Sequence, residues 1–524
     1  MSLLKKKEMR GMTQQAKKDT TKLAMMVLVL GVFMSALDNG IISAALTTIN
    51  SSFNVSEVQG SWGITLYTLG MAISTPIIGK LADRYGRKKL FMIEISVFAL
   101  GSLLVALSPT FTLFLAARFI QALGGGGIFI IASSFVLTVF PKEKQGGLLG
   151  MLGAVNGIAS VVGPNVGSLV LNMTGKWHWL FLINLPIALI IIVTGLMWIP
   201  ETKINVMKRT DYWGTVLLSL GILSFMLAIT NLQQSDLLGS LLSAKVLGFL
   251  ILGIVLFVGL FLLEKANESK DVDAILAYHL LTNRNFMLTL LMGLLTGTLI
   301  AIFVYIPSYV EHRLGVSANQ AGVYMSGIGL ASIVGAGSGG RFVDKKGARQ
   351  TILIASLISF IGFGSLAFFS TSTTSFLITS SVTGLGFGML MGAPLSVLAS
   401  EAAGEEKGSA LGTLSVSRQV GLTIAPTLYA ALIQNGFEPL LPEIKQTVSS
   451  DYMTDKLGNL NTSSVESILL GIKDVPNSSE KSQMLDIFYN TAHTAYQHMF
   501  LMSTVASALI LVFALLLKQK KKTS

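Results

Sequence analysis

The chain has 524 residues, of which 52% are hydrophobic and only 12% are charged, and its formal net charge is +11. Soluble globular proteins average about 25% charged residues, so this composition excludes an ordinary soluble enzyme, a disordered chain and a coiled coil. The apolar residues form long blocks rather than the alternation of membrane β-strands, and no cysteine is present for a disulfide, a thiolate nucleophile or a cysteine-ligated metal. The composition therefore indicates an all-α polytopic membrane protein.

A basic segment at 1–22 precedes the first apolar block, which is long enough to span a membrane. Because a transmembrane helix needs about 20 mostly apolar residues, the same criterion predicts fourteen spans along the chain. They lie at 23–46, 59–79, 89–107, 111–135, 145–171, 178–199, 212–232, 241–263, 286–310, 319–338, 351–369, 375–398, 408–434 and 496–517.

The distribution of basic residues predicts the orientation, because cytoplasmic loops carry an excess of Lys and Arg. Both termini, including the tail at 518–524, and the loops after the second and tenth spans are basic. The segment 435–495, on the opposite side, holds four Lys and eight acidic residues. We therefore expect both termini in the cytoplasm, and we attribute the net charge to topology and contact with anionic lipid rather than to nucleic acid.

Two short loops carry the same pattern, G-x-x-x-D-x-x-G. The first, after the second span, contains Gly79, Asp83, Arg84, Gly86 and Arg87, and the second, after the tenth span, contains Gly340, Asp344 and Gly347. Matched positions predict duplicated halves with two extra spans between them. Glycine permits close approach, Asp accepts from helix N-terminal amides, and Arg87, Lys88 and Lys89 are expected to pair across the seam. The pattern predicts a latch that holds one conformation.

Three ionisable residues lie well inside predicted spans: Asp38, Arg118 and Arg418. Intramembrane charges are expensive and are functional candidates by default. At 1.5 Å per residue, Asp38 and Arg118 lie about 12 Å and about 10 Å from the outer ends of their spans. We expect both to face one aqueous cavity, where proton, arginine and substrate compete for the carboxylate; the alternative is a static pair that fixes helix packing. Glu94, nearer a span end, is expected at the interface.

Arg418 and its neighbour Gln419 are predicted near the membrane midplane. The arginine is a candidate for coupling, for binding an anionic group, or for capping the carbonyls of a broken helix. Other intramembrane polar residues either bond helix to helix or line a cavity: Gln121, Asn156, Asn165 and Asn184.

Longer motifs give the sequence a family resemblance. It resembles the major facilitator superfamily, and specifically the fourteen-span drug:proton antiporters. Besides the loop at 79–87, the likeness rests on residues 37–46 (L-D-N-G-I-I-S-A-A-L), on Arg118 to Gln121 (R-F-I-Q), and on 177–186 (W-H-W-L-F-L-I-N-L-P). The fifth-span antiporter signature is approached by Gly150, Ala159, Gly163, Pro164 and Gly167.

The resemblance implies a major facilitator fold with two six-helix bundles, at 23–200 and 286–517, and two additional transmembrane helices within 201–285. It also implies proton-coupled antiport of hydrophobic, often cationic drugs, with small-molecule substrate and protons as partners and no cofactor. The fifth-span signature is expected to prevent leakage, and the outer segment 435–495 to form short helices over the cavity.

We therefore expect a multi-pass exporter of the bacterial plasma membrane, working as a monomer, although sodium coupling stays open. The alternatives are a same-fold exporter of an anionic metabolite, nucleotide or lipid that uses Arg118 and Arg418, and a sensor or scaffold without transport. We expect no enzyme and no bound metal, since the sequence contains neither a G-x-x-x-x-G-K-[ST] phosphate loop nor an H-E-x-x-H or G-x-S-x-G motif.

Overall fold

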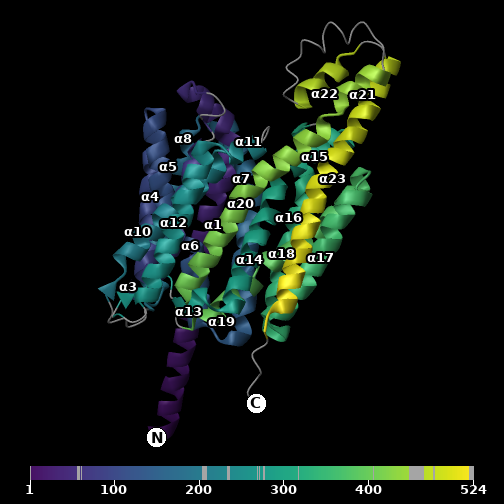
Figure 1. The fold of residues 1–524 in the computed structure, drawn as a ribbon. Coiled ribbons are helices and arrows are strands. Elements are labelled where there is room, and N and C mark those ends of the chain that lie inside the picture. Colours follow the sequence, from purple (N-terminus) through teal and green to yellow (C-terminus); the bar gives the residue numbers. More distant parts are fainter. Residues whose placement is uncertain are drawn as a thin grey trace.

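A computed structural model describes residues 2–518 apart from 56–59, 61, 203–208, 233–236, 268–269, 271, 275, 277, 317, 405, 448–464 and 476–477. The described chain is almost entirely helical (Figure 1). Its only strands are β1 (Arg209–Thr210) and β2 (Val272–Asp273), which pair in parallel.

The N-terminal helices are long and separated by short turns. They are α1 (Ser2–Phe53), α3 (Trp62–Tyr85), α4 (Arg87–Ala106), α5 (Phe111–Gly125), α6 (Ile128–Val139), α7 (Lys142–Thr174), α8 (His178–Leu182) and α9 (Asn184–Trp198). Their buried apolar side chains form two adjoining clusters between Ala24 and Ile199. One of these clusters reaches across to α16 and α20, so the halves share an apolar seam.

The C-terminal helices repeat this arrangement around a second core, from Leu280 to Leu517. They are α14 (Arg284–Ala301), η1 (Ile302–Val304), α15 (Ile306–Leu314), α16 (Ala318–Lys346), α17 (Ala348–Phe369), α18 (Thr373–Met391), α19 (Pro394–Ala403), α20 (Lys407–Phe437), α21 (Leu440–Thr447), α22 (Val465–Lys473) and α23 (Ser478–Leu516).

Four helices separate the two halves along the sequence: α10 (Tyr212–Thr230), α11 (Leu237–Leu241), α12 (Ala244–Asn267) and α13 (Tyr278–Leu281). Side chains of α10 and α12 form a small apolar cluster with α3 and reach Val416 of α20. In Figure 1 this pair lies beside the N-terminal helices. The two extra spans are thus accommodated at the flank of the molecule, outside the seam between the halves.

Each predicted span coincides with one helix or with a helix broken into two or three segments. Eleven helices in the described residues are long and apolar enough to cross a membrane. The remaining three predicted spans correspond to α7, α16 and α20, in which many glycines and serines lower the hydropathy. Together with α3, these three helices form the seam, where small residues allow close packing. The all-α fold is confirmed, and the total of fourteen crossings stays a prediction.

Both termini lie at the same end of the molecule (Figure 1). At the opposite end α21 and α22 pack over α15 and α23, where Ile444, Ile468, Ile472 and Phe488 are buried. The described part of the outer segment therefore forms two short helices, α21 and α22, as expected, and also the first half of the long helix α23. It covers the C-terminal bundle alone.

Candidate functional site

A buried carboxylate among the N-terminal helices is held by three side-chain donors. Asp38 Oδ2 accepts from Arg118 Nη1 at 2.9 Å, and Oδ1 accepts from Gln121 Nε2 and Asn184 Nδ2, each at 2.9 Å. Ser102 Oγ accepts from the same two amide groups at 2.8 and 3.2 Å. Asp38 and Arg118 are each 1% exposed. Four helices, α1, α4, α5 and α9, therefore meet at one ion pair.

Aromatic rings enclose the cation of this pair. The guanidinium carbon of Arg118 lies 4.1 Å from the ring centre of Tyr67 and 5.6 Å from that of Phe181. The negative face of an aromatic ring attracts a cation, most strongly where water is excluded. Arg118 is thus stabilised in place by a carboxylate and by two rings.

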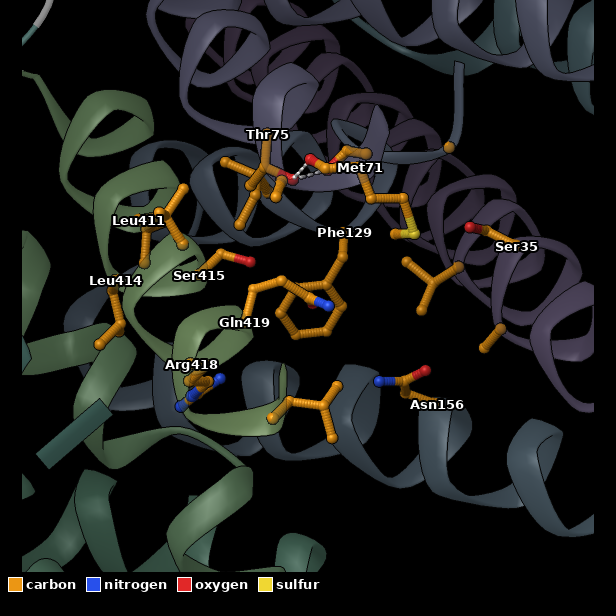
Figure 2. A pocket seen from close by; sticks show the side chains of 18 of the residues that line it. Ser35, Met71, Thr75, Phe129, Asn156, Leu411, Leu414, Ser415, Arg418 and Gln419 are labelled. Carbon is orange, nitrogen blue, oxygen red and sulfur yellow. Dashed lines mark hydrogen bonds between the residues drawn. The ribbon is translucent and has the colours of Figure 1, made fainter. Parts of the chain in front are cut away.

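A cavity of about 390 Å³ lies between the N-terminal and C-terminal helices (Figure 2). Its apolar wall includes Met71, Phe129, Met391, Leu411 and Leu414. Polar side chains from α1, α3, α7, α19 and α20 interrupt this wall: Ser35, Thr68, Thr75, Asn156, Ser396, Ser415, Arg418 and Gln419. An apolar wall with a few polar groups is the usual lining of a small-molecule site.

Arg418 is the only charged residue among the described residues that line the cavity. Its Nε and Nη2 are buried and have no hydrogen-bond partner within the described part of the chain. An unpaired buried donor is costly, and an unpaired cation more so. The cavity therefore offers a positive charge to whatever binds there, and two buried donors of the same side chain are left without a partner among the described residues. The predicted polar residues Asn156 and Gln419 line the same cavity.

The sequence places Asp38 and Arg118 on one aqueous cavity, and the structure differs. The two side chains do contact each other, but neither lines the described cavity, which α1 reaches through Ser35 and Ala36. The amide donors of Gln121 and Asn184 draw the carboxylate into the bundle instead. In this conformation the geometry is that of the alternative, a pair that fixes helix packing.

The two loop motifs bind across the seam reciprocally. Asp83 Oδ2 accepts from the backbone N–H of Gly408, at the start of α20, at 2.7 Å. Asp344 accepts from the N–H groups of Gly146 and Gly147, near the start of α7, at 2.7 and 2.8 Å. The first turns of helices favour an anion. Each half therefore binds the beginning of a helix in the other half.

Glycines of the two motifs make this approach possible. Gly86 and Gly347 join consecutive helices at φ values of 109° and 88°, where side chains are strained. A Cβ on Gly79 would lie 2.3 Å from the carbonyl oxygen of Gly408, and a Cβ on Gly340 equally close to that of Gly146. Any larger residue would separate the halves at these points.

Among the described residues, Arg87, Lys88 and Lys89 form no ion pair across the seam, in contrast to the prediction. Arg87 lies one turn beyond Asp83 and binds it at 2.5 Å within the same half, while its Nε donates to Ser134. Arg84 lies with its guanidinium carbon 5.6 Å from the ring centre of Tyr85. The backbone N–H groups of Lys88 and Lys89 donate to Glu201, at the end of the N-terminal helices. A different ion pair crosses the seam, between Lys80 and Glu406 at 3.4 Å.

The fifth-span signature packs α7 against two different helices. A Cβ on Gly163 would lie 2.7 Å from the Cα of Gly40 in α1, and a Cβ on Gly150 would lie 2.5 Å from the carbonyl oxygen of Ala336 in α16. The other residues of the signature belong to α7: Ala159 and Gly167, both buried, and Pro164, whose side chain, like that of Asn165, lies outside the described residues.

Sequence reasoning missed the importance of two buried residues. Glu94, which we expected at the membrane interface, is only 2% exposed, and it accepts a hydrogen bond from the N–H of Gly127 at 2.9 Å. Ser102 is fully buried in the Asp38 network. The run of four glycines at 124–127 was the available signal for Glu94, because such a run weakens a helix and frees backbone donors.

The family profile of the Major Facilitator Superfamily matches residues 28–426. The chain belongs to this superfamily. Within it the chain belongs with the multidrug efflux transporters, as the sequence motifs indicate: it is 30% identical over 428 residues to Multidrug resistance protein 3 of Bacillus subtilis (strain 168), covering 81% of this chain and 82% of that protein.

Two further similarities agree with membership of the superfamily. The chain is 52% identical over 494 residues to YfiU, an uncharacterised MFS-type transporter of the same organism, covering 94% of this chain and 95% of that protein. Among solved structures, the human organic anion transporter MFSD10 (TETRAN) superposes with a TM-score of 0.55, covering 93% of this chain and 99% of the other at 13% identity. At that identity the match supports the fold alone.

Proposed function

We propose that this superfamily member is a proton-coupled exporter that carries amphipathic organic molecules through the cavity between its halves. The observation that supports this is the combination of one cavity lined by both halves with two reciprocal latches at one end of the seam. By the excess of Lys and Arg in cytoplasmic loops, the basic loops favour the cytoplasmic side for that end. The conformation is then closed to the cytoplasm, and release of both latches opens the cavity to the cytoplasm.

The charge of the cavity favours substrates that carry an acidic or strongly accepting group on an apolar body. Arg418 is its one charged lining residue in the described chain, and the donors on Nε and Nη2 are unused. A carboxylate on the substrate neutralises this cation, whereas a cationic drug is repelled by it. This favours the anionic alternative over the cationic compounds that the family resemblance implies.

Transport of two charged dyes into proteoliposomes under an imposed pH gradient tests this function. We expect purified protein to transport carboxyfluorescein and to transport ethidium poorly, and we expect a sodium gradient to be ineffective. Arg418→Gln should lower dye transport at least tenfold, since a charge-assisted hydrogen bond contributes about 1.5–3 kcal/mol. Arg341→Gln, at an exposed arginine outside the cavity, is the matched control.

Two results would contradict the proposal. Transport indifferent to the pH gradient would exclude proton coupling. Ethidium transport that exceeds dye anion transport, and that survives Arg418→Gln unchanged, would restore the cationic substrate class.

A further inference from the structure

Glu94 occupies a break in the helix that lines the cavity. In a regular helix the N–H of Gly127 would donate to the carbonyl oxygen of Leu123, four residues earlier. That oxygen instead accepts from Ser74 Oγ of α3 at 2.6 Å. The freed N–H donates to Glu94 Oε2 of α4 at 2.9 Å. A side chain from each neighbouring helix has therefore replaced one backbone hydrogen bond between α5 and α6.

No cation accompanies this carboxyl group among the described residues. Glu94 makes its one hydrogen bond to Gly127 and no ion pair. The helices α6 and α9, which pack on α4, carry no charged residue. In α3, Lys80 binds Glu406, Asp83 binds Gly408, and Arg84 lies by the ring of Tyr85. Tyr67 of α3 packs on Arg118 of α5, which binds Asp38. The remaining groups are His178 of α8, and Arg87, Lys88 and Lys89 at the start of α4 itself.

One peptide group connects this carboxyl group to the cavity. The N–H of Gly127 and the C=O of Gly126 belong to the same peptide unit. The C=O side accepts from Thr75 Oγ1 at 3.0 Å, a hydroxyl that is shared with the carbonyl oxygen of Met71 at 2.6 Å. Both Thr75 and Gly126 line the cavity. Figure 2 shows Thr75 at the cavity wall. A hydroxyl group in the cavity and a buried carboxyl group thus bind opposite ends of one amide.

Gly127 cannot be replaced without disturbing this arrangement. A Cβ there would lie 2.7 Å from Glu94 Oε2 and 2.1 Å from a methyl group of Ile78. The carboxyl group therefore packs directly on the backbone of the cavity wall, with no side chain between them. Removal of its proton leaves an anion that a single amide donor cannot satisfy, so this wall must rearrange or admit water.

We propose that Glu94 is a proton-binding site of the transport cycle, protonated in the conformation described here and deprotonated when the cavity opens to the other side. This inference rests on the proposed proton-coupled function. Asp38 contrasts with it, because Arg118 neutralises its charge and three donors satisfy its oxygens. Glu94 has no such compensation, since one amide N–H is its donor among the described residues and an unpaired buried carboxylate is costly.

Glu94→Gln is the informative variant, because glutamine retains the acceptor for Gly127 but binds no exchangeable proton. Glu264→Gln is the matched control: Glu264 is also fully buried and accepts from a backbone N–H, that of Leu276, but it lies on α12 and does not line the cavity. Infrared titration of the purified protein reports the carbonyl stretch of a protonated acid without any substrate.

We expect Glu94→Gln to remove one pH-dependent carboxylic-acid band and to reduce dye transport driven by a pH gradient at least tenfold. Exchange of carboxyfluorescein across the membrane without a gradient should stay within about twofold of wild type, and Glu264→Gln should leave gradient-driven transport unchanged. A purely structural acceptor role would be maintained by glutamine.

An unaltered carboxylic-acid band in Glu94→Gln, or wild-type coupling to the pH gradient, would overturn the assignment. The infrared result does not depend on the dye. A wild-type protein that transports neither dye but loses the band in Glu94→Gln would refute the proposed function while retaining the proton site.

Discussion

Asp38 and Arg118 form a buried ion pair in which each charge stabilises the other. Burying two charges in a medium of low dielectric constant costs several kcal/mol per ion, and here the loss is offset by mutual attraction, three amide or guanidinium donors and two aromatic rings. Removing either partner leaves the other charge buried and unpaired. Removing both leaves a polar but neutral network.

Two variants at this pair distinguish a structural role from proton carriage. We expect Asp38→Asn to lower the free energy of unfolding by about 3–5 kcal/mol, because Arg118 loses its counter-ion. The double variant Asp38→Asn/Arg118→Gln should recover much of that stability and retain transport coupled to the pH gradient. Thermal melting in detergent and the dye assay measure the two effects. A stable double variant without coupling would restore Asp38 as the proton carrier.

Residue depth was predictable from the sequence, whereas the direction of each side chain was not. Counting 1.5 Å per residue placed Asp38 and Arg118 at similar heights, and the two are in contact. Counting residues does not predict in which direction around the helix axis a side chain points. Lipid and protein neighbours are equally apolar, so hydropathy does not show that α1 turns Ser35 to the cavity and Asp38 away from it.

At the scale of elements, the apolar blocks locate the helices well and their breaks poorly. The α18–α19 interruption occurs at Gly392 and Pro394, where a break is readable from residue type. The α5–α6 break depends on Ser74 and Glu94, which come from other helices. Partners so distant in sequence leave no local pattern, and the glycine run alone does not identify them.

The end of α15 provides a pH-sensitive contact outside the predicted span 286–310. His312 Nδ1 lies 2.9 Å from Tyr496 Oη, among the rings of Phe437 and Phe488. Burial, with a contribution from the positive charge of Lys473, lowers the pKa of His312 to about 4 from the usual 6.5. Between these values the unfolded chain binds a proton that the folded chain excludes.

Folding stability from this histidine is therefore complete above about pH 6.5 and lost as pH falls toward 4, by up to about 3 kcal/mol. We expect the melting temperature of His312→Phe to depend less steeply on pH than that of wild type across this interval. His279→Phe, at an exposed histidine, is the control. Equal slopes in wild type and His312→Phe would show that His312 is solvated in solution.

At the scale of the whole molecule, the duplicated loops act as a matched pair. Asp83 binds the beginning of α20 and Asp344 the region near the beginning of α7, so each half contributes one acid and one helix. Close glycine contacts accompany both latches, and farther along α7 a Cβ on Gly157 would meet nothing within 4 Å. Among the described residues, the close packing between the halves is therefore found mainly at the end of the molecule where the loops at 79–87 and 340–347 lie.

This arrangement predicts how the equilibrium between conformations responds when the acids are neutralised. Asparagine keeps an acceptor but loses the charge that a helix N-terminus favours, about 1 kcal/mol for each latch, or roughly fivefold in the ratio of the two states. Because the chain has no cysteine, Ser415→Cys in the cavity can be labelled alone with a membrane-impermeant maleimide.

In inside-out vesicles we expect labelling at position 415 to be slow with both latches intact, faster in Asp83→Asn or Asp344→Asn, and fastest in the double variant. Asp211→Asn is the control, since Asp211 accepts from Gly214 within α10 and does not cross the seam. If the two single variants are labelled at similar rates and the double variant is labelled faster, both latches stabilise the same closed state. If only Asp83→Asn accelerates labelling, the repeat at 340–347 has kept the geometry of a latch without its energetic role.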